Sequence, residues 1–469
     1  MKLLYNLLLA TMVTAICSSC ASNPFSSYKS TSDTTLHKIY SGKLPMAMEA
    51  ESTSDPLYNM EYGSLLRMDL NYSQSNYYFS LAQQSMDVWA NSWMSTTGGQ
   101  LSNTALSMVV NDNATEYQPR GYERSFVTTY HALNHLDLNN WENARVEIKR
   151  MYQIEQATEN YNQALYNQEA QEFQKIKQDN QQNYLSTQIL KKYNFTDINT
   201  PQVLALKNSY QNAFSHYLAG FVFEALNEPS LSRPGYVKAG QLNPNNTLIQ
   251  QSIDNIDSNT RSKKGTTDLL IVEELGHAPQ IKSEEIHVPI NLNFSASQNN
   301  QQSCINMIDV FYPRLIMDRL NTMPYSFSLD NTNYNPMLMV DVNLMVARSI
   351  RDQTPHIIAR NVAAAVRNIA TSQAACTAGN NGGSLGTILS LGTSLGGMLL
   401  DRADERTWTL LPSKIYINRV NNLAYGEHKI TVNINGVPHI QTITLNQPYQ
   451  IVTFRVIGSQ IIFNLQKGS

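Results

Sequence analysis

The chain has 469 residues, a net charge of −3 and a sequence pI of about 6.3, which leaves room for two or three domains. It has no basic block and no interleaving of aromatic with basic residues, so we expect no nucleic-acid partner. The apolar fraction of 42% is that of an ordinary globular protein, and composition alone indicates no activity.

The first residues have the pattern of a secretory signal peptide. Lys2 is followed by an apolar run, LLYNLLLATMVTAI, that is too short to span a membrane. Cys17 and Cys20 come next, with the spacing of a redox or zinc CxxC motif. A redox pair needs a folded scaffold that lowers the pKa of one thiol, and a signal segment has none. We therefore interpret the pair as part of a processing site.

Cys20 is the better candidate for the processed cysteine, because small residues precede such a site. Two serines precede Cys20, whereas Ile16 precedes Cys17. The stretch resembles a bacterial lipobox, and Ala21 resembles the pattern of lipoproteins sorted to the outer membrane. We expect a signal peptide over residues 1–19 and lipidation at Cys20, which would anchor a periplasm-facing chain without a transmembrane segment.

Residues 20–54 are rich in serine and threonine and lack periodicity, which predicts a flexible tether. Residues 55–265 then show helical periodicity in recurring pairs of helices. The landmarks Gly63, Ala132 and Gly220 begin intervals that resemble those of the tetratricopeptide repeat. A Gln-rich run between the second and third units predicts one long, largely exposed helix.

Stacked helix pairs of this type leave a concave groove that binds segments of other proteins. We expect such a groove along the first helix of each pair. Tyr62, His131 and His216 occupy first helices and are the candidate binding residues. The expected partner is another protein of the cell envelope.

The hydrophobic periodicity of the sequence changes in the second half of the chain. Residues 266–335 and 406–469 alternate as strands do, and Asn435-Gly436 is the strongest hairpin signal. Residues 336–405 show helical patterns. We expect an α+β chain in which the two β segments meet in a small sandwich-like domain, with the intervening helices packed against it.

Two cysteines, Cys304 and Cys376, remain beyond the signal. In an oxidising compartment they can form one disulfide, although a buried unpaired thiol is equally tolerated. The number of cysteines does not decide between these alternatives.

A glycine-rich stretch holds the sharpest enzymatic signal in the sequence. The sequence GGSLGTILSLGTSLGG contains G-x-S-x-G twice, and Ser394 would be the nucleophile of a serine hydrolase. That motif needs a strand before the serine and a helix after it, but a helix-like stretch precedes Ser394 and a polar loop precedes Ser384. We favour a packing helix over residues 382–400, with a membrane or oligomer contact as the alternative, and regard the chain as non-enzymatic.

Two further pairs of residues share a helix face. His131 and His135 stand four apart, but a metal site needs three or four converging ligands, so packing histidines are expected and no metal. Arg360 and Arg367 stand seven apart, which indicates either a solvated face or an anion site for a glycan or lipid phosphate. No cofactor-binding motif is present in the sequence.

Four phrases resemble a family of proteobacterial outer-membrane lipoproteins. They are YERSFVTTYHALNHL with WENARVEIKRM, HYLAGFVFEAL, DVNLMVARSIRDQTPHIIARNVAAAV and DRADERTWTLLPSKIYINRV. The resemblance implies a lipobox, a tetratricopeptide-like N-terminal half and a β-rich C-terminal half. Members are often encoded near a lipoprotein that resembles an activator of penicillin-binding proteins, which implies a role in envelope assembly.

The leading hypothesis is a lipid-anchored interaction scaffold in cell-envelope assembly, secretion or peptidoglycan synthesis. The alternatives are an envelope serine hydrolase that uses Ser394 and a surface-exposed factor that contacts a host cell.

Overall fold

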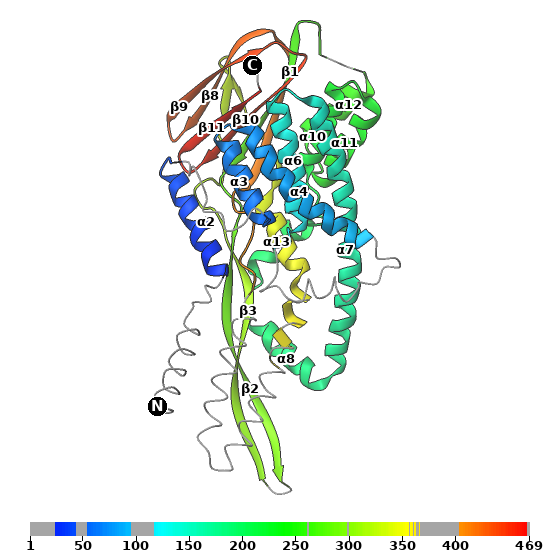
Figure 1. The fold of residues 1–469 in the computed structure, drawn as a ribbon, viewed down its shortest axis with the longest axis vertical. Helices are drawn as coiled ribbons and strands as arrows, with labels where there is room; N and C mark the ends of the chain where they lie inside the picture. The colour runs from blue at the N-terminus through cyan, green and yellow to red at the C-terminus, as the bar shows by residue number, and fades with distance from the viewer. Residues whose placement is uncertain are drawn as a thin grey trace, which may run out of the picture.

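The computed structural model describes residues 24–43, 54–94, 117–259, 262–297, 300–355, 357–359, 361–362, 365 and 403–466. The N-terminal half of this part is helical and the C-terminal half is rich in strands, which confirms the expected mixed class (Figure 1). The helices are α2 (Pro24–Tyr40), α3 (Pro56–Met68), α4 (Tyr72–Met94), α6 (Gly121–Asp137), α7 (Trp141–Gln178), α8 (Asn180–Lys192), η1 (Thr196–Ile198), α9 (Pro201–Ala205), α10 (Ala213–Ala225), α11 (Pro229–Leu242), α12 (Thr247–Asp257) and α13 (Val342–Asp352). The strands are β1 (Thr266–Leu275), β2 (Gln280–Ser297), β3 (Asn300–Ile316), β4 (Phe327–Leu329), β5 (Thr332–Tyr334), β6 (Met337–Asp341), β7 (Lys414–Ala424), β8 (Gly426–Ile434), β9 (Val437–Leu445), β10 (Tyr449–Ile457) and β11 (Gln460–Leu465).

Three helix pairs, α3/α4, α6/α7 and α10/α11, turn in the same way. The turn of each pair contains one residue in the left-handed region, and these are Leu70, Asn139 and Asn227, with φ of 61°, 57° and 62°. Asparagine tolerates this conformation well, whereas leucine does so rarely. Each of the three stands seven positions after the landmark glycine or alanine of its first helix.

The first and third pairs also share a close approach between their two helices. Ser75 Oγ donates to the Gly63 carbonyl at 2.7 Å, and Ser232 Oγ donates to the Gly220 carbonyl at 2.8 Å. An aromatic ring four residues after each serine lies over the glycine, so the glycine has no room for a side chain. In the third pair this ring belongs to Tyr236.

One expectation about the N-terminal half was wrong. Residues 24–40 belong to α2 rather than to a flexible tether, because Leu36 and Ile39 are buried against the body of the protein. The Gln-rich run is helical, as expected, but it is divided between the distal part of α7, a helix of 38 residues that ends at Gln178, and α8. Straight-chain residues such as glutamine and glutamate have good helix propensity, which favours this extension beyond the packed region.

The two β segments meet in one sheet, as expected. Its order is β11-β10-β1-β7-β6, with β1 parallel to β10 and antiparallel to β7. Successive residues of β1 face opposite sides. Leu270 and Val272 pack with the helices, whereas Leu269 and Ile271 pack with a second sheet of order β5-β4-β8-β9. The central sheet is therefore buried on both faces, between a helical layer and a second sheet.

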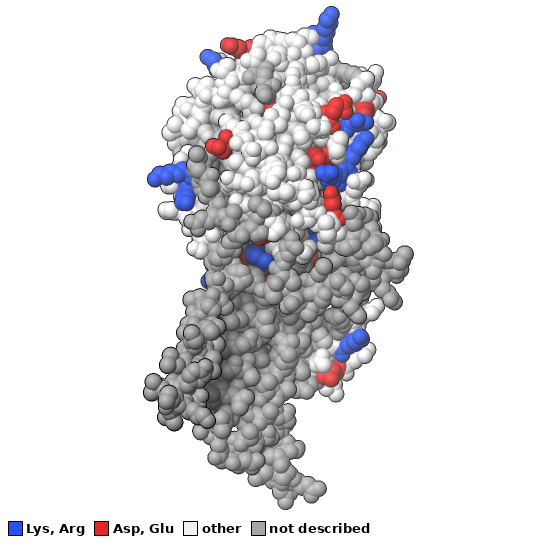
Figure 2. Space-filling view, in the orientation of Figure 1, with Lys and Arg blue, Asp and Glu red and all other residues white. Residues whose placement is uncertain are grey.

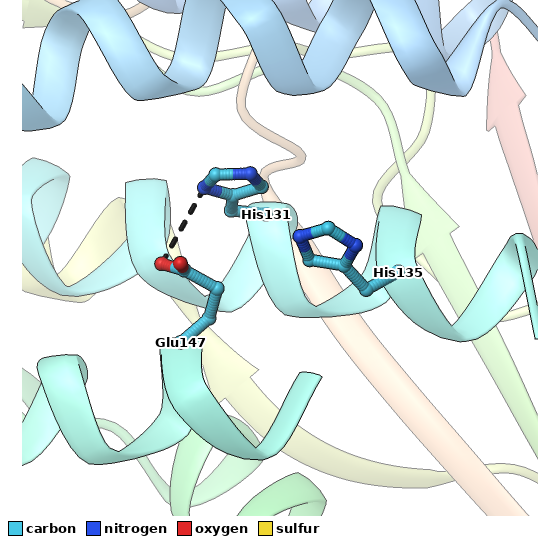
Figure 3. A group of neighbouring side chains, drawn as sticks. All are labelled: His131, His135 and Glu147. Carbon is cyan, nitrogen blue, oxygen red and sulfur yellow. Dashed lines mark ion pairs between the residues drawn. The ribbon is translucent and has the colours of Figure 1, made fainter. Parts of the chain in front are cut away.

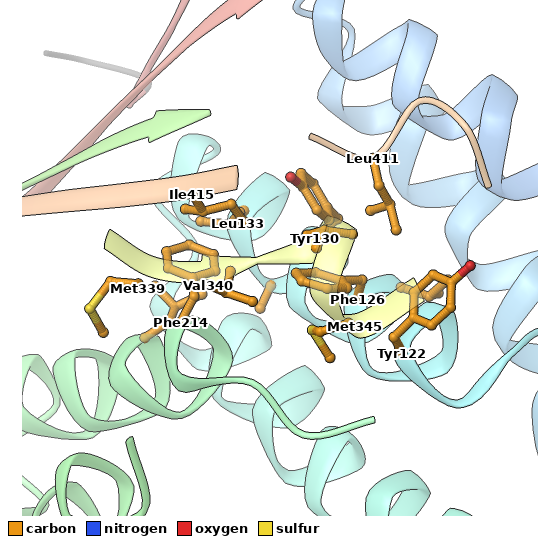
Figure 4. Packing of buried hydrophobic residues seen from close by; sticks show 14 of the residues in the cluster. Tyr122, Phe126, Tyr130, Leu133, Phe214, Met339, Val340, Met345, Leu411 and Ile415 are labelled. Carbon is orange, nitrogen blue, oxygen red and sulfur yellow. The ribbon is translucent and has the colours of Figure 1, made fainter. Parts of the chain in front are cut away.

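The helical layer and the central sheet share one continuous core. Figure 4 shows side chains from α6, α10, β6, α13 and β7 packed together. Polar contacts cross the same boundary. Tyr130 of α6 donates to Glu274 of β1 at 2.9 Å, and Arg419 of β7 pairs with Glu224 of α10 at 2.6 Å.

The hairpin predicted at Asn435-Gly436 joins β8 to β9, and both residues have positive φ, as a tight hairpin turn requires. The other long hairpin, β2/β3, is not part of the sandwich. Its two strands pair with each other as a separate ribbon that extends away from the body (Figure 1). The base of the ribbon packs on α8 through Val288 and Val310.

Substitution of two glycines of the third helix pair, Gly220 and Gly240, tests how closely α10 packs on α11. We predict that Gly220→Ala lowers the free energy of unfolding by about 1–3 kcal/mol, because its Cβ would lie 2.6 Å from the buried Tyr236 ring. Gly240→Ala should instead raise it by about 0.5–1 kcal/mol, because the new Cβ meets only Ile249, at 3.5 Å, and alanine favours a helix. Urea denaturation measures both, and equal effects of the two substitutions would contradict the packing described.

Candidate functional site

The inner face of the helical layer, where the groove was expected, is filled by the chain itself. The segment 403–413, here called the strap, runs across it before β7 begins. Trp408 of the strap is fully buried, and its ring centroid lies 5.9 Å from that of Phe79 and 6.0 Å from that of Tyr130. Its indole N–H donates to Ser64 Oγ at 2.9 Å.

Two buried carboxylates of the helical layer hold the strap through its backbone. Glu61 accepts hydrogen bonds from the N–H groups of Thr409 and Leu410 at 2.7 and 3.0 Å. Glu123 accepts one from the N–H of Trp408 at 2.8 Å. Burial raises the pKa of Glu61 to about 7, although these hydrogen bonds act in the opposite direction.

The expectation that His131 and His216 line an open groove was therefore wrong. Their exposed fractions are 6% and 1%. His216 Nε2 lies 3.1 Å from Glu155, inside the helical layer. An amphipathic helix has the same pattern whether its apolar face is covered by a partner or by its own chain, and here the chain covers it.

Tyr62 differs from the two histidines because it is partly exposed. It belongs to a group of tyrosines on α3 and α4. Its ring stacks on Tyr58 with centroids 5.6 Å apart and meets Tyr78 edge to face at 4.6 Å. Burial and the neighbouring tyrosines raise the pKa of Tyr58 to about 12.

His131 and His135 are brought together with Glu147 of α7 (Figure 3). The two imidazole rings stack, with centroids 4.9 Å apart and an interplanar angle of 21°. His131 Nδ1 lies 3.4 Å from Glu147 Oε2. The sequence supplied only the two histidines, whereas the packing of α7 on α6 adds a carboxylate that lies twelve residues beyond His135.

The surroundings set the protonation of this cluster. Burial and the neighbouring His131 lower the pKa of His135 to about 4. Burial alone would raise the pKa of Glu147, but the hydrogen bond and charge of His131, with Arg150, hold it below its usual value. At neutral pH the cluster therefore contains a neutral His135 imidazole and an ionised Glu147 carboxylate.

A cleft of about 700 Å³ lies elsewhere, between the distal half of α7, the loop after α9 and the end of α13. Its size is in the usual range for ligand pockets. Three cations and two carboxylates line it, together with aromatic and amide side chains. The lining residues are Glu159, Asn162, Gln163, Tyr166, Ala170, Phe173, Gln174, Lys207, Asn208, Ser209, Tyr210, Arg348, Arg351, Asp352 and Pro355.

The charges that line this cleft are partly paired. Arg348 Nε donates to Asp352 at 2.7 Å, and Arg351 Nε donates to the Asn199 side chain at 3.1 Å. Lys207 is exposed. Figure 2 shows one face of the molecule, and the acidic and basic side chains drawn there are interspersed rather than gathered into patches of one charge.

Several predicted site residues lie outside the described residues. These are Cys20, Arg360, Arg367, Cys376 and Ser394. Cys304 is part of β3, opposite Leu292 of β2, but its predicted bonding partner is not among the described residues. His428, a histidine that lies after Ser394 in the chain, has its Nδ1 2.5 Å from Asp330 and its Nε2 2.8 Å from the Ala424 carbonyl.

No family model, curated protein or solved structure matches the chain. Within the described part of the chain, no helix is both long enough and apolar enough to cross a membrane.

Proposed function

We propose that the chain is a lipid-anchored envelope protein that binds a protein partner and has no catalytic activity of its own. Its role would lie in envelope assembly, secretion or peptidoglycan synthesis. The signal-like N-terminus and the lipobox at Cys20 support the anchor. The resemblance to outer-membrane lipoproteins supports the compartment.

The three helix pairs are, in this proposal, tetratricopeptide-like repeats. The left-handed turn residues at equal spacing support it, as do the matching Ser75 and Ser232 hydrogen bonds. Such repeats normally bind partners on their inner face. Because the strap and the central sheet occupy that face here, a partner has to bind elsewhere.

The observation that carries the proposal is the cleft beside α7. It is a concave surface formed by three separate elements, and its rim combines aromatic rings with amide groups and cations. These groups suit an extended, weakly acidic peptide segment, whose backbone the amides would bind and whose carboxylates would meet Lys207 and Arg351.

Site-specific photo-crosslinking in intact cells tests the cleft. A photoreactive amino acid in place of Gln163, which lines the cleft, should give a discrete adduct with one envelope protein. The same amino acid in place of Gln84, which is exposed on α4 away from the cleft, should give none.

A charge reversal then tests the chemistry of the adduct. Lys207→Glu should reduce its yield several-fold, whereas Lys149→Glu, at an exposed position of α7 outside the cleft, should not. Equal adducts from both crosslinker positions, or none from either, would reject the cleft as the binding surface.

The anchor is tested separately by fractionation. We predict that Cys20→Ala moves the protein from the membrane to the soluble fraction, because the acylated cysteine is lost. Cys17→Ala should leave it in the membrane fraction. The reverse pattern would place the processing site at Cys17, and protease treatment of intact cells would reveal a surface-exposed orientation.

A further inference from the structure

We infer that His131, His135 and Glu147 form a binding site for a divalent transition-metal ion, most suitably Zn²⁺. This inference is independent of the proposed function, because the cluster lies between α6 and α7 rather than in the cleft. Imidazole nitrogen and carboxylate oxygen are the ligands of many zinc sites that have three protein ligands.

The geometry of the cluster suits such an ion. The two histidines stand one turn apart on α6, so both rings leave the helix on the same side. One ligand atom from each of the three residues lies within 4.8 Å of the others. The 3.4 Å between His131 Nδ1 and Glu147 Oε2 equals the separation, about 3.4 Å, of two ligands at 2.1 Å from a tetrahedral ion.

Neighbouring amides contact all three residues. Gln83 of α4 donates to Glu147 Oε2 at 2.6 Å, and its oxygen lies 3.0 Å from His131 Nδ1. The Asn76 amide lies 3.5 Å from His135 Nδ1. Without an ion, His131 Nδ1 carries a proton that it donates to the Gln83 oxygen, so an ion bound at Nδ1 requires the other tautomer and takes the place of that hydrogen bond.

The burial of the three residues suits a preformed site that an ion can reach from solvent. His131 and Glu147 are 6% and 5% exposed, whereas His135 is only half-buried and opens the cluster towards solvent. Arg150 Nη1 lies 3.3 Å from Glu147 Oε1 and 3.4 Å from Oε2, so an ion at Oε2 would share Glu147 with this guanidinium. Three protein ligands leave a fourth position for water or for a group from a partner.

A second cluster provides a matched control. Glu285, His287 and Asp309 also have ligand atoms within 4.8 Å of one another, but they lie on the surface of the β2/β3 ribbon. Exposed side chains of this kind lose more conformational freedom when they bind an ion. His287→Ala therefore removes a histidine from this second cluster of similar composition and leaves the proposed site unchanged.

The experiment titrates Zn²⁺ into the chelator-treated full chain in competition with a chromophoric chelator. We expect one equivalent of tightly bound Zn²⁺ and a dissociation constant raised at least about 10-fold by His135→Ala and by His135→Gln. His287→Ala should leave the constant unchanged. Co²⁺ in place of Zn²⁺ should give the intense visible absorption of a tetrahedral site, and His135→Gln should remove it.

Thermal unfolding provides the second readout. Zn²⁺ at 100 times its dissociation constant should raise the melting temperature of the wild type but not that of His135→Gln, because only a folded site binds the ion. Circular dichroism checks that both His135 variants are folded. Unchanged affinity in both variants, loss of binding in His287→Ala, or no tight binding by the wild type would overturn the inference.

Discussion

The buried carboxylates of Glu61 and Glu123 fix the C-terminal part of the chain to the helical layer. Glu61 accepts two backbone N–H groups from the strap and Glu123 accepts one. A buried carboxylate without such partners costs several kcal/mol, so the helical layer is incomplete without the strap. Trp408 fills the space between the rings of Phe79 and Tyr130 in the same place. The hydrogen bonds to the two buried carboxylates and the packing of Trp408 therefore favour the same arrangement of the strap.

The strap covers the inner face of the helical layer, and this changes how the helical half can bind a partner. In a free-standing array of helix pairs, the inner face is available to a partner. Here the strap, β1 and β10 cover it, and the core is continuous from α6 to the central sheet. The surfaces left for recognition lie outside this core, and the α7 cleft of about 700 Å³ is one of them. The half-buried His135 also lies towards the outside, which makes an ion there compatible with the closed core.

Much of the fold could be predicted from local patterns. The polar break at 69–71 separates α3 from α4, and Asn435-Gly436 joins β8 to β9, because both signals act within a few residues. The α2 helix could not be predicted in this way. Its sequence is rich in serine and threonine, and its stability depends on distant contacts, such as the 3.2 Å hydrogen bond from Ser32 to Thr409.

The candidate site was predicted less well, and for a related reason. His131 and His216 were expected on an open surface, but burial is a property of the assembled layers and not of the helix face. The pairing of His131 with His135 was visible from their spacing on one helix. Glu147 was not, because its approach depends on how α7 packs against α6. The cleft also required three elements that are far apart in the sequence.

The strap joins the helical and β-rich halves into one cooperative unit. Hydrogen exchange of a folded Trp408→Ala variant measures this cooperativity, because removing a buried tryptophan should destabilise the unit by about 3–5 kcal/mol. We predict that amide protection falls together in α3, α6, β1 and β10. A loss of protection confined to residues 403–413, with α6 and β1 unchanged, would mean that the strap does not join the two halves.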